Sequence, residues 1–356
     1  MGQLSQLQKL VASHNSLEGK IPTNFTGCTC LKGLYLNGNN LIGKVSVKVG
    51  SLGKLQHLIV AKNQLTKGIT SFIGNLSSLI HLSGSAANQF NGPLSPNMFH
   101  TLPNLQEIYI ADNQVSGPIP PSITNAFILS RLEISINYFT GQVPSLGKLQ
   151  NLLYLTLEKN NLGDIPGTIR ECRMLEYLYM QGNSLQGIIP SSLASLKCLK
   201  CLDLSRNCLS GSIPTILQNI SFLEYFNVTF NILDGEVPIE GVFGNASRLV
   251  VIGNSKLCGG ISELHLPPCL VKGKKLAKFR LVAVIVSVVA FLLILSVILA
   301  IYWMRKNSKK PSLDPPTIGE LARVSYQSLH DRTYGFSTTN LIGSGILALS
   351  AKELLS

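Results

Sequence analysis

Hydrophobic and polar positions recur along most of the chain in the pattern LxxLxLxxN. The leucines of the LxL segment alternate, which predicts a short strand whose leucines point inward. The asparagines that end successive copies are 23 to 25 residues apart: Asn15, Asn39, Asn63, Asn88, Asn113, Asn137, Asn160, Asn183, Asn207 and Asn231. Ten copies in one phase indicate stacked coils, each burying the apolar face of its neighbour.

The asparagine and the segment after it complete each repeat. We expect each Asn side chain to bond the backbone of adjacent turns, so that the column forms a buried ladder. A segment L-x-G-x-[IV]-P follows most of them, in which Gly suits a tight turn and Pro ends a second short strand. It is intact at 19–22, 117–120, 141–144, 187–190, 211–214 and 235–238, shifted at 163–166, and degraded near Gly43, Gly68 and Gly92.

Charge is distributed unevenly along the 356 residues. The chain is 45% hydrophobic and only 13% charged, and this composition argues against a disordered chain. Its net charge is +12. Residues 271–356 hold 12 of the 30 basic residues but only 4 of the 18 acidic ones. These basic residues flank an apolar run, so they indicate a membrane border and predict no nucleic-acid partner.

The apolar run itself predicts a transmembrane helix. Residues 281–301 read LVAVIVSVVAFLLILSVILAI and carry no charge. As a helix they would span roughly 31 Å, the thickness of the hydrocarbon layer. Tyr302 and Trp303 follow as interface anchors. Basic residues flank both ends, so the positive-inside rule does not decide the orientation.

Five glycosylation sequons favour an extracellular repeat region. They begin at Asn24, Asn75, Asn219, Asn227 and Asn245, and none lies beyond Ser247. Each alone is a weak signal. Asn227 falls on a predicted strand, where a glycan would cover the strand side of the array. We expect the repeats outside the cell and the C-terminus in the cytosol.

With its L-x-G-x-[IV]-P segments the array resembles the plant-type leucine-rich repeat. That resemblance implies a twisted leucine-rich-repeat solenoid with strands on the concave side and short 3₁₀ turns behind. Cys258 and Cys269 lie in the segment that closes the last coil, beside Pro267, and a structural disulfide is expected there. The alternative is two free thiols in a cytosolic protein.

The other cysteines have a simpler interpretation. Cys28 and Cys172 precede repeat leucines and are expected to be buried. Cys198, Cys201 and Cys208 have a metal-like spacing, but no histidine is near and Cys201 belongs to the strand frame, so we predict no metal site.

The segment after the apolar run, RVSYQSLHDRTYGFSTTNLIGSG, resembles the entry to the kinase domain of plant leucine-rich-repeat receptor-like Ser/Thr kinases. The resemblance is to the immune-receptor subfamily that includes the rice receptor for Xanthomonas resistance, with both ends truncated, since no signal peptide precedes the repeats. Domains are predicted as follows: repeats 1–252, cap 253–270, basic juxtamembrane segment 271–280, transmembrane helix 281–303, cytoplasmic juxtamembrane segment 304–337, and vestigial kinase start 338–356.

The kinase resemblance ends at the glycine-rich loop. Gly343 and Gly345 match it, but Ala348 replaces its third glycine. No V-A-I-K lysine or D-F-G aspartate follows, since Lys352 is too close behind the loop to be that lysine. We therefore expect no catalysis by this chain and no cofactor, because ATP and Mg²⁺ belong to the full-length family. An incomplete sequence of an active kinase is the alternative.

The main hypothesis is a plasma-membrane recognition module for an extracellular peptide, glycan or protein, used in plant defence or signalling. A decoy or co-receptor partner is a third possibility, with a co-receptor kinase as a possible partner. Outward strand positions that could anchor a ligand are Tyr35, Lys62, Tyr109, Asp112, Glu133, Glu158, Lys159, Tyr179, Asp203 and Arg206.

Overall fold

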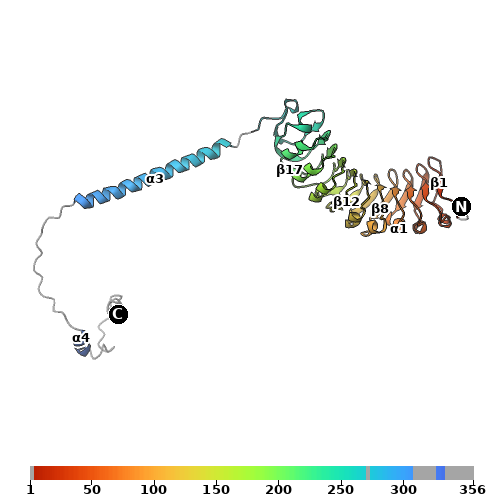
Figure 1. Ribbon diagram of the computed structural model, residues 1–356, viewed down its shortest axis with the longest axis horizontal. Helices are drawn as coiled ribbons and strands as arrows, with labels where there is room; N and C mark the ends of the chain where they lie inside the picture. The colour runs from red at the N-terminus through yellow and green to blue at the C-terminus, as the bar shows by residue number, and fades with distance from the viewer. Residues whose placement is uncertain (1–3, 270–272, 308–325, 333–356) are drawn as a thin grey trace, which may run out of the picture. The chain divides into compact units, whose positions relative to one another are not determined.

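The computed structural model describes residues 4–269, 273–307 and 326–332. The chain divides into two compact units, Met1–Val271 and Lys272–Ser356. The first unit is a leucine-rich-repeat solenoid, in which each coil adds one strand to the same sheet (Figure 1).

An eleven-stranded parallel sheet runs the length of the first unit, in chain order. The middle residue of most strands is buried, because the inward leucines of neighbouring coils pack on one another. The strands are β1 (Lys9–Val11), β3 (Gly33–Tyr35), β5 (His57–Ile59), β7 (His81–Ser83), β9 (Glu107–Tyr109), β11 (Arg131–Glu133), β13 (Tyr154–Thr156), β15 (Tyr177–Tyr179), β16 (Cys201–Asp203), β18 (Tyr225–Asn227) and β20 (Leu249–Val250).

Two smaller parallel sheets follow the ladder asparagines on a second side of the coils. The seven-stranded sheet comprises β2 (Glu18–Gly19), β4 (Asn40–Lys44), β6 (Gln64–Lys67), β8 (Gln89–Pro93), β10 (Gln114–Pro118), β12 (Tyr138–Gly141) and β14 (Asn161–Leu162). The three-stranded sheet comprises β17 (Ser210–Gly211), β19 (Ile232–Val237) and β21 (Lys256–Gly259).

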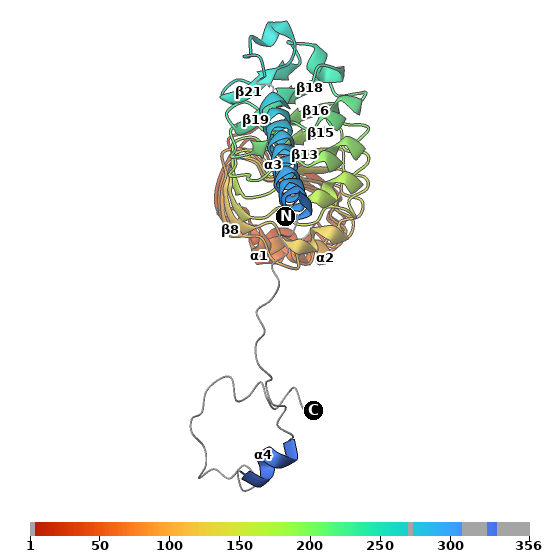
Figure 2. The same cartoon turned by 90° about the vertical axis from the view of Figure 1, so that its left-hand side faces the viewer.

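Short helices complete the coils, and Figure 2 shows the coils turning gradually about the length of the array. Most are 3₁₀ turns, although two coils carry a turn of α-helix. They are η1 (Thr23–Gly27), η2 (Val47–Ser51), α1 (Thr70–Ile73), α2 (Met98–Thr101), η3 (Pro121–Asn125), η4 (Gly167–Glu171), η5 (Ser191–Ser195), η6 (Thr215–Asn219), η7 (Gly241–Gly244) and η8 (Ser262–Leu264).

The asparagine column forms a hydrogen-bonded ladder through the array. Asn63 is 2% exposed, and its Nδ2 donates to Leu36 O of the preceding coil at 2.9 Å and to Val60 O of its own coil at 3.1 Å. Its Oδ1 accepts from Leu41 N at 3.0 Å. Each rung therefore satisfies buried backbone groups of two coils at once.

The ladder has an eleventh member that the sequence analysis placed in the cap. Asn254 donates to Val228 O and Val251 O, both at 2.9 Å, and accepts from Leu233 N at 3.1 Å. The regular array therefore continues past residue 252, and β21 pairs with β19 beyond it.

The second unit contains two described helices, α3 (Gly273–Asn307) and α4 (Tyr326–Arg332). Within α3, residues Val282–Lys306 are long and apolar enough to cross a membrane, and none of that stretch is buried in the structure. The helix extends beyond both ends of the predicted span 281–303.

Candidate ligand-binding face

Two columns of residues flank the buried central positions of the eleven-stranded sheet, on the surface that we call the strand face. The strands pair in register, so the residues before the buried central positions align, as do the residues after them. The first column is Lys9, Gly33, His57, His81, Glu107, Arg131, Tyr154, Tyr177, Cys201 and Tyr225. The second column is Val11, Tyr35, Ile59, Ser83, Tyr109, Glu133, Thr156, Tyr179, Asp203 and Asn227.

The predicted surface residues fall into three groups in the structure. Five lie in the second column: Tyr35, Tyr109, Glu133, Tyr179 and Asp203. Four lie on the turn just before a ladder asparagine, all exposed and with left-handed φ between 51° and 56°: Lys62, Asp112, Lys159 and Arg206. Glu158 lies between these groups and is half-buried.

Asp203 is held within the protein, in contrast to the outward position we expected for it. It is 9% exposed. Its Oδ1 accepts from Ser205 N at 2.9 Å and its Oδ2 from Asn227 Nδ2 at 3.0 Å. The sequence does not disclose this burial, because it depends on the neighbouring coil supplying Asn227.

The sequence analysis missed the most continuous feature of the strand face, which lies in the first column. The Arg131 guanidinium sits 3.7 Å from the centre of the Tyr154 ring, and Tyr154 stacks on Tyr177 with ring centroids 4.5 Å apart. Lys200 Nζ lies 6.0 Å from the Tyr177 ring and 2.8 Å from Glu176 Oε2. Counting to the residue before the second leucine of each repeat would have found the tyrosines.

Glu107 joins the two columns near the middle of the strand face. Its carboxylate accepts from the Tyr109 hydroxyl at 3.0 Å and lies 3.6 Å from His81 Nδ1 and 3.9 Å from Arg131 Nε. Burial and this hydrogen bond raise the pKa of Tyr109 to about 12.

A histidine pair occupies the first column nearer the N-terminus. The rings of His57 and His81 meet edge to face at 4.8 Å, and Tyr35 lies 6.1 Å from His57. Burial, His81 and Lys9 lower the pKa of His57. The part of the chain that the structure describes contains no group of three or more His, Cys, Asp or Glu suited to a metal ion.

Glu133 and Glu158 form the most acidic part of the strand face. Glu133 is half-buried, and burial, with a smaller effect of Glu158, raises the pKa of its carboxyl, while Arg131 opposes the shift. Gln181 donates its side-chain amide to Glu158 Oε2, yet its own Oε1 is buried and accepts no hydrogen bond from the described residues.

The sequons divide between the two sides of the array. Four lie at the short helices and are exposed: Asn24, Asn75, Asn219 and Asn245. Asn227 lies in the second column, half-buried and bonded to Asp203.

The cysteines also separate into two kinds. Cys258 and Cys269 form a disulfide, beside which Gly259 N donates to Pro267 O at 2.9 Å. The other described cysteines form no disulfide: Cys28, Cys172 and Cys201 are buried, Cys30 and Cys198 are half-buried, and Cys208 is exposed. Gly343 and Gly345 of the predicted vestigial loop lie outside the described residues.

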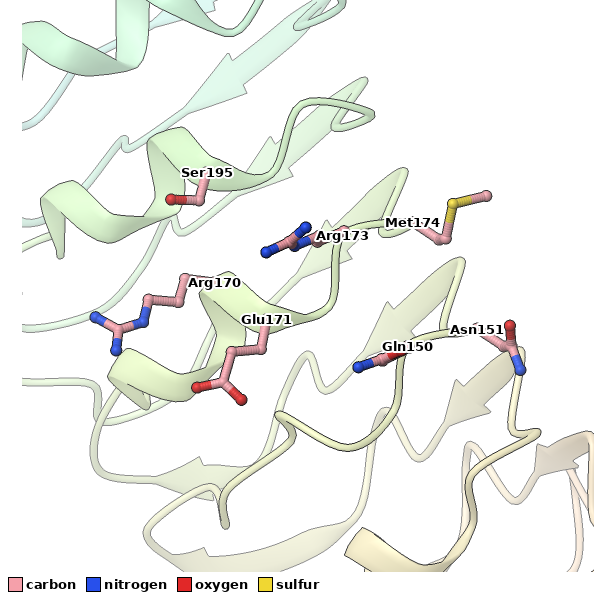
Figure 3. A pocket seen from close by; sticks show the side chains of 7 residues that line it. All are labelled: Gln150, Asn151, Arg170, Glu171, Arg173, Met174 and Ser195. Carbon is pink, nitrogen blue, oxygen red and sulfur yellow. The ribbon is translucent and has the colours of Figure 1, made fainter.

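A shallow depression of about 770 Å³ lies away from the strand face, at η4 and η5 (Figure 3). All seven lining residues are exposed: Gln150, Asn151, Arg170, Glu171, Arg173, Met174 and Ser195. Its two arginines lie beside Glu171, so the depression offers mixed charge and no defined ligand chemistry.

Family models described as leucine-rich repeat match residues 129–185 and residues 6–28, 104–126 and 198–220. The receptor kinase-like protein Xa21 of Oryza sativa subsp. japonica is 40% identical over 105 residues, covering 30% of this chain and 10% of that protein. The LRR receptor-like serine/threonine-protein kinase EFR of Arabidopsis thaliana is 36% identical over 129 residues, covering 32% and 12%. The chain thus matches about a tenth of the length of these relatives.

Solved ectodomains share the fold. The ectodomain of the Arabidopsis thaliana receptor kinase GASSHO1/SCHENGEN3, in complex with CASPARIAN STRIP INTEGRITY FACTOR 2, has a TM-score of 0.71 and 32% identity, covering 76% of this chain and 32% of that chain. The Arabidopsis receptor kinase HAESA, in complex with the peptide hormone IDA and the co-receptor SERK1, has a TM-score of 0.68 and 34% identity, covering 72% and 44%.

Proposed function

We propose that this chain, whose homologues over the repeats are plant leucine-rich-repeat receptor kinases, is the membrane-anchored recognition module of such a receptor. Its strand face would bind an extracellular peptide, and a co-receptor kinase would join the complex. The similar HAESA ectodomain supports the choice of a peptide over a glycan, because its structure contains the peptide hormone IDA and the co-receptor SERK1.

The observation that carries the proposal is the run of aromatic and charged side chains across consecutive coils of the strand face. Arg131, Tyr154, Tyr177 and Lys200 contact one another in sequence. Tyr and Arg are the residue types that contribute most to binding interfaces. Residues 76–218, which include this run, contain no sequon, so glycans would leave it open.

The proposed topology places the repeats outside the plasma membrane and the C-terminus in the cytosol. The exposed sequons and the disulfide Cys258–Cys269 suit an oxidising, glycosylating compartment. The uncharged stretch 281–304 within α3 suits lipid.

The topology is tested by expressing the full chain with a C-terminal tag in plant cells. Glycosidase treatment should lower the apparent mass of the protein, and protease added to intact cells should remove the repeats but spare the tag. A soluble, unglycosylated product would contradict the proposal.

Peptide binding is tested by selecting a displayed random dodecapeptide library on the full chain in lipid nanodiscs. We expect the selected peptides to lose binding to the double variant Tyr154→Ala, Tyr177→Ala. They should keep binding to Tyr138→Ala, which removes a 58% exposed tyrosine from β12 instead. Equal retention by both variants would move the binding surface away from the strand face.

Phosphoryl transfer is a second candidate, favoured by the names of the relatives. The corresponding test is radiolabel transfer from ATP to a general kinase substrate by the immunopurified chain. Transfer above that of a mock purification would establish the enzyme function for this polypeptide.

A further inference from the structure

Two carboxylates that form no ion pair among the described residues, Glu133 and Glu158, lie next to each other along the strand face. Glu133 lies in the second column on β11, and Glu158 lies two residues beyond the end of β13, the next strand of the sheet. Both carboxylates are half-buried, and they repel each other enough to affect the protonation of Glu133. Repulsion of this kind is relieved when a cation binds between the two groups.

Arg131, the cation closest in sequence to Glu133, contacts two other groups. Arg131 lies over the Tyr154 ring at 3.7 Å and reaches Glu107 at 3.9 Å. Within residues 4–269, the Glu133 carboxylate makes no hydrogen bond and no ion pair. A half-buried carboxylate without such partners is costly, so the folded protein favours an external cation there.

Aromatic rings stand on both sides of the two carboxylates. Tyr109 is in register with Glu133 on the preceding strand, and Tyr179 is in register with Thr156 on the following side. Thr156 is the small second-column residue between Glu133 and Tyr179. The faces of tyrosine rings attract cations, and a small residue between them leaves room above the sheet.

Hydrogen-bond capacity at this place is weighted towards acceptors. The Tyr109 hydroxyl already donates a hydrogen bond to Glu107, and the Gln181 side-chain amide already donates one to Glu158. Glu133 accepts no hydrogen bond from the described residues and Glu158 accepts one from Gln181, so both carboxylates keep acceptor positions to spare. A guanidinium, with five N–H donors in a planar fork, matches such a surface better than a single ammonium.

We propose that Tyr109, Glu133, Glu158 and Tyr179, the acidic cradle, bind a basic side chain of the peptide ligand, arginine in preference to lysine. This inference rests on the proposed function and specifies which chemistry the strand face selects. Glu133 and Glu158 pair with the guanidinium, and the two tyrosines border it.

The test uses two biotinylated pentapeptides, Gly-Gly-Arg-Gly-Gly and the same peptide with citrulline, immobilised at high density. Citrulline keeps the shape of arginine but carries no charge. Binding of the full chain in nanodiscs is measured by interferometry. The arginine peptide should bind about tenfold more tightly than the citrulline peptide, and a lysine peptide should lie between them.

Matched variants separate the acidic cradle from general charge attraction. Glu133→Gln and Glu158→Gln should each weaken the arginine peptide about tenfold and leave the citrulline peptide unchanged. Glu224→Gln removes the same charge from an exposed site beside β18 and should change binding less than about twofold. Circular dichroism should show the same fold for all three variants.

Several outcomes would overturn the inference: no binding of the arginine peptide, equal binding of arginine and citrulline, or an equal loss in Glu224→Gln. The proposed function fails separately. If library peptides depend on Tyr154 and Tyr177 but show no arginine enrichment and no response to Glu133→Gln, peptide recognition stands and the acidic cradle is wrong.

Discussion

Tyr154 and Tyr177 stack with their ring planes only 6° from parallel, although they belong to different coils. Parallel register places them side by side in the first column. Arg131 continues the stack on one side and Lys200 on the other. A surface that four consecutive coils build together keeps its shape only while those coils stay stacked.

Replacing Tyr177 by alanine should destabilise the array by about 0.5–1.5 kcal/mol beyond the loss of buried area, because the ring pair is lost. Tyr177→Phe should retain most of that stability. Urea unfolding of the repeat unit, followed by circular dichroism, measures the difference. Tyr138→Ala is the control, and a loss of stability as large as that of Tyr177→Ala would show that the stack contributes nothing.

Replacing a central ladder residue should cost more. Asn137 donates to Ile110 O, Ile134 O and Ser135 O at 2.9, 3.2 and 2.9 Å, and accepts from Val115 N at 2.9 Å. Asn137→Ala removes the acceptor of the buried Val115 N, at a cost of about 1–3 kcal/mol. Each of the three carbonyls keeps a second donor, from Asn113, Asn160 or the Asp112 amide.

Thermal unfolding of the two variants Asn137→Ala and Asn91→Ala checks this prediction. Asn91 is exposed on β8, so its removal should leave the melting temperature nearly unchanged. Equal melting temperatures for the two variants would mean that the ladder bonds are replaced at no cost by water.

Protonation of His57 should lower the stability of the folded protein as the pH falls. Burial and the nearby His81 and Lys9 lower its pKa from 6.5. The Tyr35 ring packs beside His57, and Glu107 lies next to His81 on the far side from His57 in the column. The unfolded chain therefore takes up a proton before the folded chain does. The contribution of His57 is complete above the unfolded value and is lost as pH falls through the lower folded value.

His57→Gln should accordingly flatten the decline in melting temperature between about pH 7.5 and about pH 5. His265→Gln, at an exposed position in the cap, should leave the slope as it is. An unchanged slope in His57→Gln would assign the pH dependence to other groups.

Opening the disulfide should loosen the end of the array. Cys258→Ser should lower the free energy of unfolding by about 2–4 kcal/mol, as for other bridges that close a loop. Limited proteolysis should then cut between residues 256 and 269 faster than in the wild type. Cys208→Ser, which removes an exposed thiol, should have the wild-type cleavage rate.

The period of the sequence was sufficient to predict the coils, the parallel strands and the asparagine ladder, because each depends on spacing alone. Asn254 was missed because Ala246 stands where the first leucine of LxxLxLxxN would be, although its three hydrogen bonds are those of the other rungs. The sequence showed where the consensus pattern of the repeat ends, and the structure shows that stacking continues for one more coil.

The strand face was harder to predict, because its properties come from neighbours in space. The stack of Tyr154 on Tyr177 needs two coils in register, and the burial of Asp203 needs Asn227 from the next strand. Neither pair is visible within a single repeat. The predicted surface residues therefore include five of the second column and none of the first.

Each ladder asparagine from Asn39 onward bonds its own coil and the one before it, so a whole coil is the unit in which the array can change length. A recombination event that deletes one whole coil lets every remaining rung meet an equivalent partner. A deletion of half a coil breaks a rung and exposes the leucines beside it. Solenoids built this way can change length in whole coils, and each change gives the residues of the two columns new neighbours on the strand face.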